Sequence, residues 1–513
     1  MLRKTFGVVS LTLLLFSPPI VFVPEAKAQV FGPPFEYNLY PTNPTRVVIV
    51  DVNRDGKPDL VVSIHGSDDK STDGAVTVLL GNGDGTFQFS GSYDSGGWDT
   101  QGLAVADVDG DGKPDVVVAN GTGVGGVGPG NVAVLLGNGD GTFKPFVTYA
   151  AGDTLPGSVA IGDVNGDGNP DLVVGSNQTV DVLLGNGDGT FRTAVTYGSG
   201  GFGASVAVAD VNHDGKLDIE LVNRCTTITN NLCVGDGSAG VLLGNGEGSF
   251  QPVVTYPAGG ENPYGIAVAD VNGDGYPDLL TANIVSLSTV YSGAIGVLLG
   301  NGDGTFRAPI PYLTGGTNGT QVAVADVNGD GKLDLVTFAE NPAALIVLLG
   351  NGDGIFQAPV QFDVGGFIPF GLGVDDMNGD GKPDVAVANY DYFVSMLINS
   401  PEVVIAGSPQ QPLTKDAHGN FVANVTITNH GNVLIASAQI TAATLGSASA
   451  LSFPGPITNL VPGASAVVKL IFPPSSAPAG AKTAPLKVSG TYSAPLFSTV
   501  GGNWGLSFRS VTL

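Results

Sequence analysis

The sequence predicts an all-β protein, a seven-bladed β-propeller followed by a β-sandwich domain. Three observations support this prediction: an acidic nine-residue segment recurs seven times, short apolar runs bounded by glycine-rich turns surround each copy, and an alternating pattern replaces the repeats from about residue 401. The chain holds 78 glycines and 34 prolines, yet 42% of its 513 residues are hydrophobic, which is enough to form cores. A repeat of about 50 residues is typical of folds that use one supersecondary unit many times.

The acidic segment reads Asp-Val-Asp-Gly-Asp-Gly-Lys-Pro-Asp in its second copy, which spans Asp107–Asp115. Every copy has oxygen-bearing side chains at positions 1, 3, 5 and 9 and a glycine at position 6. Ca²⁺ takes six to eight oxygen ligands, which an EF-hand loop supplies at a similar spacing, and the glycine allows a sharp wrap around an ion. A turn without metal is the alternative, but sevenfold recurrence in register favours calcium. The other copies begin at Asp51, Asp163, Asp210, Asp270, Asp326 and Asp376.

Each repeat contains four short β-like runs. In the first repeat, apolar runs at 47–50 and 60–62 flank the acidic segment, and a third run ends in two leucines. A Gly-Asn-Gly-Asp-Gly turn then leads into a fourth run, which begins at Phe87 and reaches Tyr93 six residues later. Short runs joined by such turns form antiparallel hairpins, and four-stranded units repeated around an axis form a β-propeller.

The seventh repeat ends near Ser400 without a Gly-Asn-Gly-Asp-Gly turn or a fourth run. The missing strand is expected from the other end of the chain, where Phe31 and Tyr37 show the same spacing of six residues. We therefore predict that residues 31–40 complete the seventh blade and close the ring, which hides two sheet edges. A disordered mature N-terminus is the alternative.

The consensus Val-Ala-Asp-Val-Asn-Gly-Asp-Gly-Lys-Pro-Asp, followed by Leu-Leu-Gly-Asn-Gly-Asp-Gly-Thr-Phe, resembles the FG-GAP/VCBS repeat family. That family includes the calcium-loop propeller of integrin α subunits and many secreted bacterial proteins. The resemblance covers about residues 31–400 and implies a seven-bladed propeller with up to seven structural Ca²⁺ ions, each in the hairpin between the first two strands of a blade. The second blade departs from the others at position 3, where Asp109 replaces Asn. The ligands that the resemblance implies are Asp51, Asn53, Asp55, Asp59, Asp107, Asp109, Asp111, Asp115, Asp163, Asn165, Asp167, Asp171, Asp210, Asn212, Asp214, Asp218, Asp270, Asn272, Asp274, Asp278, Asp326, Asn328, Asp330, Asp334, Asp376, Asn378, Asp380 and Asp384.

The acidic segments explain much of the charge of the chain. Its formal net charge is -26, and 22 of the 46 acidic residues lie in the seven segments. Seven bound Ca²⁺ ions would reduce the net charge to -12. Only 20 residues are Lys or Arg, which argues against a nucleic-acid partner because binding to phosphates requires clustered cations.

The N-terminus has the features of a secretory signal peptide over residues 1–28. Arg3 and Lys4 precede an apolar run at 8–23, and Ala-Lys-Ala at 26–28 offers a small-x-small cleavage site. A membrane anchor is the alternative, which two prolines inside the run disfavour, and no later segment is long and apolar enough to span a bilayer. We expect a secreted, extracellular or cell-surface protein, with the periplasm as an alternative location.

The two cysteines of the chain, Cys225 and Cys233, lie eight residues apart in one connection of the fourth repeat. In an oxidising compartment a local disulfide is expected between them, and two free thiols are the alternative.

The mature propeller is expected to cover residues 29–400, and a second domain residues 401–513. Apolar and polar residues alternate in this second part, for example from Phe421 to Ile427. Period-two alternation with Pro/Gly/Ser separators predicts a β-sandwich. A Thr-Asn-His-Gly-Asn segment at 428–432 resembles a turn of bacterial immunoglobulin-like modules, which gives the expected class of this domain.

Strand alternation places the acidic segments and the Gly-Asn-Gly-Asp-Gly turns on one face of the propeller. The more variable connections, including the links between blades, must then lie on the opposite face, and variable loops on a rigid scaffold are where binding usually occurs. Exposed aromatic side chains suit sugar rings or peptide side chains, and packing between blades is the alternative role. The aromatic candidates on these links are Trp98, Phe202, Tyr264, Phe367 and Phe370.

No catalytic constellation is visible in the sequence. The four histidines lack metal-ligand spacing, and there is no nucleophile-elbow motif. We therefore expect a calcium-binding propeller that acts in adhesion or binds an extracellular protein or glycan. Two alternatives stay open: a secreted glycosidase or polysaccharide lyase whose acids come from separate loops, and a purely structural surface protein.

Overall fold

The computed structural model describes residues 31, 34–39, 42–66, 73–123, 128–152, 155–229, 232–234, 236–287, 290–399, 405–409, 412–429, 435–460, 465–477, 481–493 and 501–512. The expected signal peptide, residues 1–28, lies outside them. These residues form an all-β protein, in which one short 3-10 helix, η2 (Pro474–Ser476), accompanies the strands. In the described part of the chain, no helix has the length and apolar character needed to cross a membrane.

The described residues from Phe35 to Leu397 form seven antiparallel four-stranded sheets, and sheets one to six follow one another along the chain. We number the sheets first to seventh. Their strands, in order of pairing, are β2 (Asn43–Val50), β3 (Asp59–His65), β4 (Ala75–Gly81) and β5 (Phe87–Asp94); β6 (Thr100–Ala106), β7 (Asp115–Thr122), β8 (Pro129–Leu135) and β9 (Val147–Ala150); β10 (Ser158–Gly162), β11 (Asp171–Gly175), β12 (Thr179–Leu183) and β13 (Val195–Gly198); β14 (Phe202–Ala209), β15 (Asp218–Cys225), β18 (Ser238–Leu242) and β19 (Val254–Pro257); β20 (Glu261–Ala269), β21 (Asp278–Leu287), β22 (Val290–Leu298) and β23 (Ile310–Leu313); β24 (Val322–Ala325), β25 (Asp334–Glu340), β26 (Ala343–Leu348) and β27 (Val360–Asp363); β28 (Pro369–Asp375), β29 (Asp384–Asn389), β30 (Phe393–Leu397) and β1 (Phe35–Asn38).

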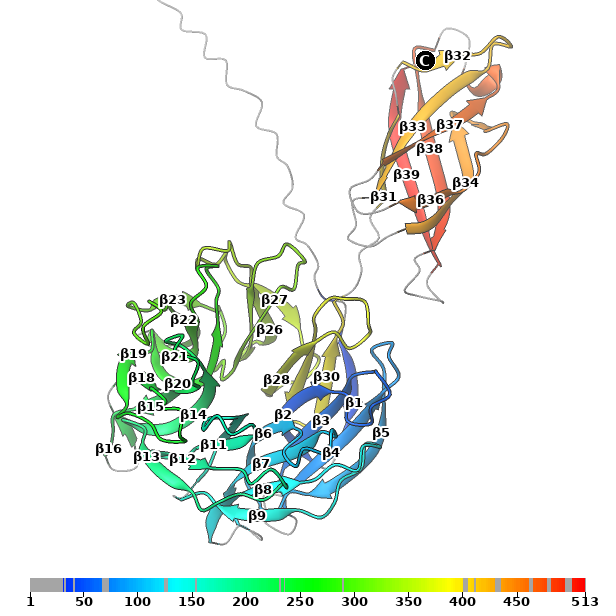
Figure 1. The fold of residues 1–513 in the computed structure, drawn as a ribbon. Coiled ribbons are helices and arrows are strands. Elements are labelled where there is room, and N and C mark those ends of the chain that lie inside the picture. Colours follow the sequence, from blue (N-terminus) through cyan, green and yellow to red (C-terminus); the bar gives the residue numbers. More distant parts are fainter. Residues whose placement is uncertain are drawn as a thin grey trace, which may run out of the picture.

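The sheets are arranged around a ring, with their fourth strands on the outside (Figure 1). On the inside, the first strand of each sheet contacts the first strand of the next: β2 contacts β6, and the series continues through β10, β14, β20 and β24 to β28, which contacts β2 again. The inner strands therefore surround a common axis. The short strands β16 (Thr227–Thr229) and β17 (Leu232–Val234) pair with each other between β15 and β18.

The seventh sheet takes its fourth strand from the opposite end of the chain. β1 pairs antiparallel with β30, with Phe35 opposite Met396 and Asn38 opposite Phe393. Just before β1, the side chain of Phe31 is 1% exposed and packs with buried residues of the sixth and seventh sheets. The N-terminal segment thus joins strands that are more than 350 residues away in the sequence.

A ring of aromatic contacts joins neighbouring sheets. The aromatic residue late in each fourth strand makes an edge-to-face contact with the phenylalanine at the start of the next sheet's fourth run, at centroid distances of 5.3 to 6.0 Å. Such contacts add to the free energy gained by burying the rings. The seven pairs are Tyr37–Phe87, Tyr93–Phe143, Tyr149–Phe191, Tyr197–Phe250, Tyr256–Phe306, Tyr312–Phe356 and Phe362–Phe31.

Glycine in the Gly-Asn-Gly-Asp-Gly turns allows adjacent sheets to approach. Gly141 in the second sheet has φ of +82°, and a Cβ atom there would lie 2.8 Å from Leu80 of the first sheet. Both the backbone conformation and the lack of space therefore require glycine. The hydroxyl of Tyr149 donates to the carbonyl of Gly189 in the next such turn, at 3.4 Å.

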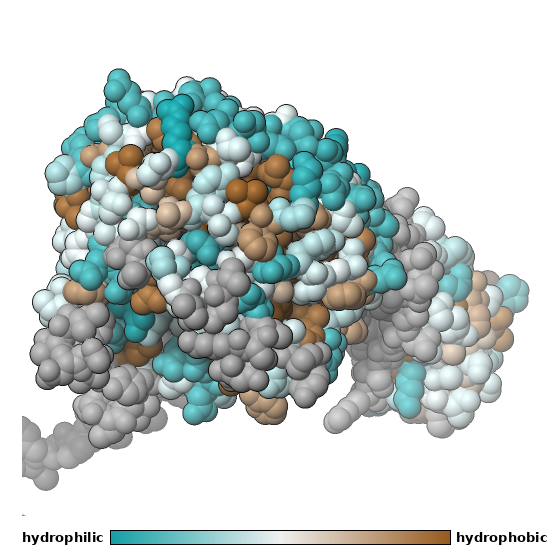
Figure 2. Space-filling model, turned by 90° about the horizontal axis from the view of Figure 1, so that it is seen from below, coloured by the Kyte–Doolittle hydropathy of each residue, from teal (hydrophilic) through white to brown (hydrophobic). Residues whose placement is uncertain are grey.

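The outer strands expose alternate side chains. Val147, Val195 and Val254 occupy the same place in three fourth strands and are each about half exposed. On the side of the molecule seen in Figure 2, hydrophobic residues are interspersed among hydrophilic ones. Single exposed apolar residues of this kind are ordinary for a folded surface.

The described residues after 404 form two further sheets. In one, β31 (Ile405–Pro409), β32 (Thr414–Lys415) and β37 (Ser465–Phe472) all pair with β33 (Phe421–Asn429). The other contains β34 (Ile435–Leu445), β35 (Ala448–Ser449), β36 (Ile457–Leu460), β38 (Thr483–Ser493) and β39 (Gly501–Thr512). Buried residues of both sheets, among them Val425, Leu470, Leu445 and Leu486, form one hydrophobic cluster.

Each interface between neighbouring sheets has its own apolar cluster, and Glu220 interrupts this pattern. In β15, Ile219 and Leu221 pack toward the third sheet, so strand alternation directs Glu220 toward the fifth. Glu220 is 0% exposed, and both of its carboxyl oxygens lack a hydrogen-bond partner among the described residues. Burial, with a contribution from Asp218, raises its pKa well above the usual range. The equivalent residues of the other sheets are Val61, Val117, Val173, Leu280, Val336 and Ala386.

We predict that Glu220→Leu stabilises the protein by about 1–3 kcal/mol, because it removes a buried, unpaired polar group. Thermal and urea denaturation would measure the change. The matched control, Leu280→Glu, places the same carboxyl at the equivalent position of the fifth sheet and should destabilise. A Glu220→Leu variant that unfolds more readily than the parent would contradict this reading of the interface.

We predict that Phe31→Ala lowers the free energy of unfolding by about 3–5 kcal/mol, the usual cost of removing a buried phenylalanine side chain. Phe35→Ala is the control, because Phe35 is 54% exposed and its loss should cost below about 1 kcal/mol. Urea denaturation of both variants makes the comparison. Equal effects would show that the N-terminal segment does not depend on Phe31 for docking.

Candidate functional site

The acidic segments form tight loops between the first and second strand of each sheet, and the second loop shows their geometry. The Asp107 carboxylate accepts hydrogen bonds from the backbone N–H groups of Gly110 and Gly112, both at 2.8 Å. The N–H of Asp111 donates to Asp109 Oδ1 at 3.1 Å. The loop therefore wraps around the carboxylate at position 1, and Gly112, with φ of +80°, provides the turn that this requires.

The aspartate at position 9 has a second role that the sequence does not reveal. Asp115 is fully buried; its Oδ2 accepts from Val108 N at 2.9 Å, and its Oδ1 accepts from Gly137 N at 2.7 Å. It thus ties the acidic loop to the Gly-Asn-Gly-Asp-Gly turn of the same sheet. All seven sheets repeat the second contact at 2.7 to 2.8 Å, with donors Gly81, Gly137, Gly185, Gly244, Gly300, Gly350 and Asn399.

Negative charge accumulates around this carboxylate. Burial raises the pKa of Asp115 to about 6, against the lowering effect of its two backbone hydrogen bonds, and Asp109 and Asp107 raise it further. A divalent cation at the same place would offset both the desolvation and the repulsion between carboxylates.

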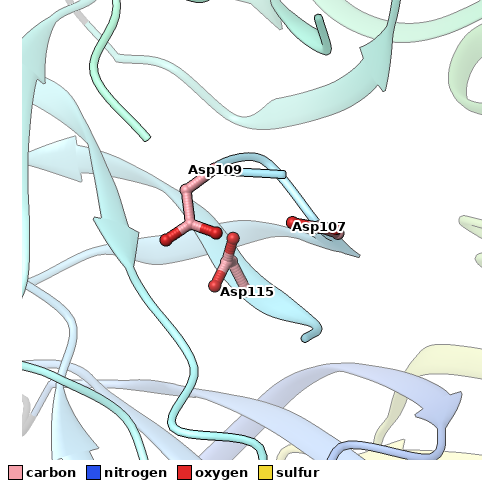
Figure 3. Close-up of side chains that lie close together, drawn as sticks. All are labelled: Asp107, Asp109 and Asp115. Carbon is pink, nitrogen blue, oxygen red and sulfur yellow. The ribbon is translucent and has the colours of Figure 1, made fainter. Parts of the chain in front are cut away.

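The residues at positions 1, 3 and 9 fit a hard cation. Oxygen atoms of Asp107, Asp109 and Asp115 lie within 4.8 Å of one another, which makes them the one such acidic cluster in the described part of the chain. In Figure 3 the Asp109 and Asp115 carboxylates point toward each other, and Asp107 lies beside them. Carboxylate oxygens are the donors that Ca²⁺ prefers. The other six loops carry Asn at position 3, which supplies an amide oxygen instead.

In the first, second, fourth and sixth loops, the position-5 aspartate lies beside the lysine two residues later, an arrangement that differs from the convergent set of four that the sequence suggests. The Asp111 carboxylate bonds Lys113 Nζ at 2.6 Å and lies outside the cluster of three. Asp55, Asp214 and Asp330 likewise lie 3.5 to 4.0 Å from the lysine two residues later. In this arrangement a local ion pair competes with a metal for the position-5 carboxylate.

A cavity of about 510 Å³ lies at the opposite end of the inner strands. The acidic loops follow the last residues of these strands, whereas the cavity is lined by residues at their beginnings, so it opens on the other face of the ring. All seven sheets contribute to its wall. One contributor from each sheet, in order, gives Arg46, Gln101, Gly157, Ser205, Tyr264, Thr320 and Phe370.

A smaller cavity of about 210 Å³ continues along the axis. It shares Arg46, Ser205 and Tyr264 with the larger one and is otherwise lined by residues further along the inner strands, such as Val159 and Val322. The two volumes therefore form an outer and an inner cavity around the same axis.

The carboxylates of the outer cavity have polar partners. Asp99 Oδ1 lies 3.2 Å from His65 Nε2 and accepts from Gln101 Nε2 at 2.9 Å. Burial raises the pKa of Asp99, but these hydrogen bonds outweigh it and leave the pKa below its usual value. The other carboxylate, Glu340, accepts from Asn318 Nδ2 at 3.0 Å.

The two arginines that line the outer cavity, Arg46 and Arg224, each contact an aromatic ring. Arg46 lies over Phe370 at 5.5 Å and donates to the carbonyls of Thr45 and Phe370 at 3.1 and 3.2 Å. Burial lowers the pKa of Arg46 to about 10, so the group stays charged at neutral pH. Arg224 lies 4.6 Å from the Tyr264 ring. Cation–π contacts of this kind fix a guanidinium without neutralising it.

Two of the five candidate aromatic residues, Tyr264 and Phe370, line the cavity. Trp98 contacts the His65 ring at 4.5 Å and so supports the partner of Asp99. Phe202 is partly buried and lies outside the lining, and Phe367 is 78% exposed. Sequence reasoning missed Arg46, Asp99, Gln101 and Arg224. A signal for Arg46 exists, since aligning the repeats places it against the small or neutral residues Gly102, Ser158, Ser205, Gly265, Gln321 and Gly371.

Cys225 is buried and disulfide-bonded. The other cysteine of the chain, Cys233, lies in β17, whose backbone pairs with β16.

We predict that Asp115→Asn destabilises the protein by about 1–3 kcal/mol even in excess chelator. An amide offers one acceptor oxygen where the carboxylate accepts two backbone N–H groups, so one buried donor loses its partner. Asp111→Asn, on the exposed Lys113 pair, is the control and should change stability in chelator by less than about 1 kcal/mol. Thermal denaturation in EDTA distinguishes the two, and equal effects would show that Asp115 acts as a ligand alone.

Two solved structures are similar to parts of this chain. Among solved structures, a lectin of Agrocybe aegerita that recognises non-reducing terminal N-acetylglucosamine is 24% identical, covering 68% of this chain and 86% of the lectin chain, with a TM-score of 0.43. A mutant Tc holotoxin pore of Photorhabdus luminescens is 15% identical, covering 87% of this chain and 19% of that one, with a TM-score of 0.30. No curated protein sequence matches.

The FG-GAP-like repeat family matches the chain five times, over residues 51–118, 124–174, 163–219, 231–281 and 283–337. Together these matches cover more than half of the sequence. The protein therefore belongs to the FG-GAP-like repeat family.

Proposed function

We propose that this protein is a secreted or cell-surface, calcium-binding seven-bladed β-propeller that binds an extracellular glycan or protein. The observation that carries the proposal is the axial cavity of about 510 Å³, to which all seven sheets contribute. Its volume falls within the range of about 300–1,000 Å³ typical of ligand sites. Its lining combines aromatic rings with fixed charges and amides, which gives it the means to orient a ligand.

A structural role for calcium, with up to seven ions, is part of the proposal. It is supported by the carboxylate cluster at positions 1, 3 and 9 and by the charge that accumulates around Asp115. With dissociation constants of about 10⁻⁴ M, ~1 mM calcium would stabilise each site by ~1.4 kcal/mol. Seven independent sites would then contribute roughly 10 kcal/mol, similar to the stability of a whole domain.

Secretion and the C-terminal domain belong to the same proposal. A disulfide at Cys225 suits an oxidising compartment, as does the expected signal peptide. The C-terminal residues are proposed to form an immunoglobulin-like β-sandwich, which the hydrophobic cluster shared between their two sheets supports. Such a domain would present the propeller at a surface or add a second binding unit.

The ligand site is tested by blocking the cavity. A Cβ atom at Gly157 would have Gln101 Oε1 at 3.8 Å as its nearest neighbour within 4 Å, so Gly157→Trp can fill the cavity without a clash at its base. Gly198→Trp is the matched control, because Gly198 is exposed at the outer strand of the same third sheet and has no atom within 4 Å of such a Cβ. Glycan and extracellular-protein arrays would be probed with the parent and both variants.

We expect Gly157→Trp to abolish binding of the ligand found on the arrays and Gly198→Trp to leave it intact. Binding that survives Gly157→Trp would remove the axial cavity from the proposal. Turnover of a bound polysaccharide would instead support the enzyme alternative, with Asp99 and Glu340 as the carboxylates that line the cavity.

We predict that chelation lowers the melting temperature by well over about ten degrees, given the stabilisation that seven sites would supply. Differential scanning calorimetry in EDTA, followed by addition of excess Ca²⁺, measures the effect and its reversal. Mg²⁺ should restore less, because it requires a tighter octahedral site. An identical melt with and without EDTA would count against the calcium assignment.

A further inference from the structure

We propose that the ligand of the axial cavity carries a carboxylate on a sugar ring, as a uronic acid does, and that this carboxylate pairs with Arg46. The inference rests on the proposed function, which assigns the cavity as the ligand site. It adds the chemical class of the ligand and the residue that selects it.

Arg46 lies close to the axis of the ring. It lies in the inner strand β2 and lines both the outer and the inner cavity. At the same level the other sheets present residues without charge, namely Gly102, Ser158, Ser205, Gly265, Gln321 and Gly371. The side chains of the other six sheets at this level are therefore mostly small, and Arg46 is the one charged residue among the seven equivalent positions.

Arg46 has no anionic partner among the residues that the structure describes. Its guanidinium contacts two backbone carbonyls and the Phe370 ring, and within the described residues it forms no ion pair. The cavity carboxylates are bound elsewhere, Asp99 by His65 and Gln101 and Glu340 by Asn318. A partly buried cation without a counter-ion is costly, and an anionic ligand supplies what the protein does not.

The side chains around Arg46 favour a carboxylate as the anion. A guanidinium presents a planar fork of N–H donors that matches a carboxylate in two-point contact. Ser158 and Ser205 line the inner cavity beside Arg46, and the hydroxyl of Ser158 already accepts from Val206 N at 3.2 Å, which leaves its own proton to donate. These groups together suit a carboxylate at the end of a ligand.

The outer cavity has polar side chains that suit a sugar ring. The inner cavity of about 210 Å³ adjoins the outer cavity of about 510 Å³ and shares Arg46 with it, so a carboxylate paired with Arg46 leaves the outer cavity for the rest of the ligand. The outer wall offers the side chains of Gln101, Asn177 and Asn318, which suit the hydroxyl groups around a sugar ring. The chain has a net charge of -26, so an acidic ligand depends on local positive charge, which Arg46 supplies at the axis and Arg224 supplies elsewhere in the outer cavity.

Two probes that differ at one carbon test the inference. Methyl glucuronide and methyl glucoside share every ring hydroxyl and differ in the carboxylate or hydroxymethyl group at C6. We expect the parent protein, in calcium, to bind the glucuronide about tenfold to a hundredfold more tightly, as a charge-assisted hydrogen-bonded pair would give. Ligand-observed NMR titration measures both affinities.

We expect Arg46→Gln to reduce this preference to within about threefold, and Arg46→Lys to retain part of it, because lysine keeps the charge but loses the fork. Arg192→Gln, at an exposed position outside the cavity, is the control and should keep the full preference. The melting temperature in calcium establishes that each variant is folded.

The outcomes separate the two proposals. An array ligand that is neutral and sensitive to Gly157→Trp, with no preference for glucuronide over glucoside, would overturn this inference and leave the proposed function standing. Binding insensitive to Gly157→Trp would overturn both. An acidic peptide that binds through Arg46 while the glucuronide does not would overturn the assignment to a sugar.

Discussion

The buried aspartate at the end of each acidic loop is the constraint on which the ring depends. Each of these carboxylates accepts a backbone N–H from the Gly-Asn-Gly-Asp-Gly turn or, in the seventh sheet, from Asn399. One residue type thereby fixes the start of the second strand and the end of the third in every sheet. Because a buried carboxylate is costly without partners, the same arrangement supports the calcium role proposed for the loops.

The two faces of the ring, at opposite ends of the inner strands, differ in how regular their residues are. On one face, loop and turn repeat with nearly the same hydrogen bonds in all seven sheets, which suits a structural role. On the other, each sheet contributes a different side chain to one cavity. A regular scaffold therefore carries an irregular site, and the irregularity gives the site its chemistry.

The residues that depart from the repeat are informative. Glu220 replaces an apolar residue inside a sheet interface and has no evident partner among the described residues; the structure gives no reason for it. Arg46 replaces a small or neutral residue at the axis and lines a cavity that reaches solvent. Both are charged residues at positions where the other repeats have uncharged ones. Their surroundings differ, because Glu220 is enclosed in a sheet interface and Arg46 lines a cavity, and only the tertiary structure shows this difference.

The sequence by itself determined the local elements: four strands per repeat, the tight acidic loops, and the N-terminal segment as a source of the fourth strand that pairs with β30. The strands and loops of each repeat follow from period-two patterns and turn residues, which act over a few positions. The N-terminal strand follows from its Phe–Tyr spacing and from the fourth run that the seventh repeat lacks. Tertiary structure alone decided that Arg46, Gln101, Tyr264 and Phe370 meet at one axis, that Asp111 turns toward Lys113, and that Asp115 bridges loop and turn. The cavity residues come from different repeats, so they meet only after the ring forms, and no local pattern shows which side chains share that space. The contacts of Asp111 and Asp115 lie within one sheet, but they depend on side-chain orientations that the repeat pattern does not specify.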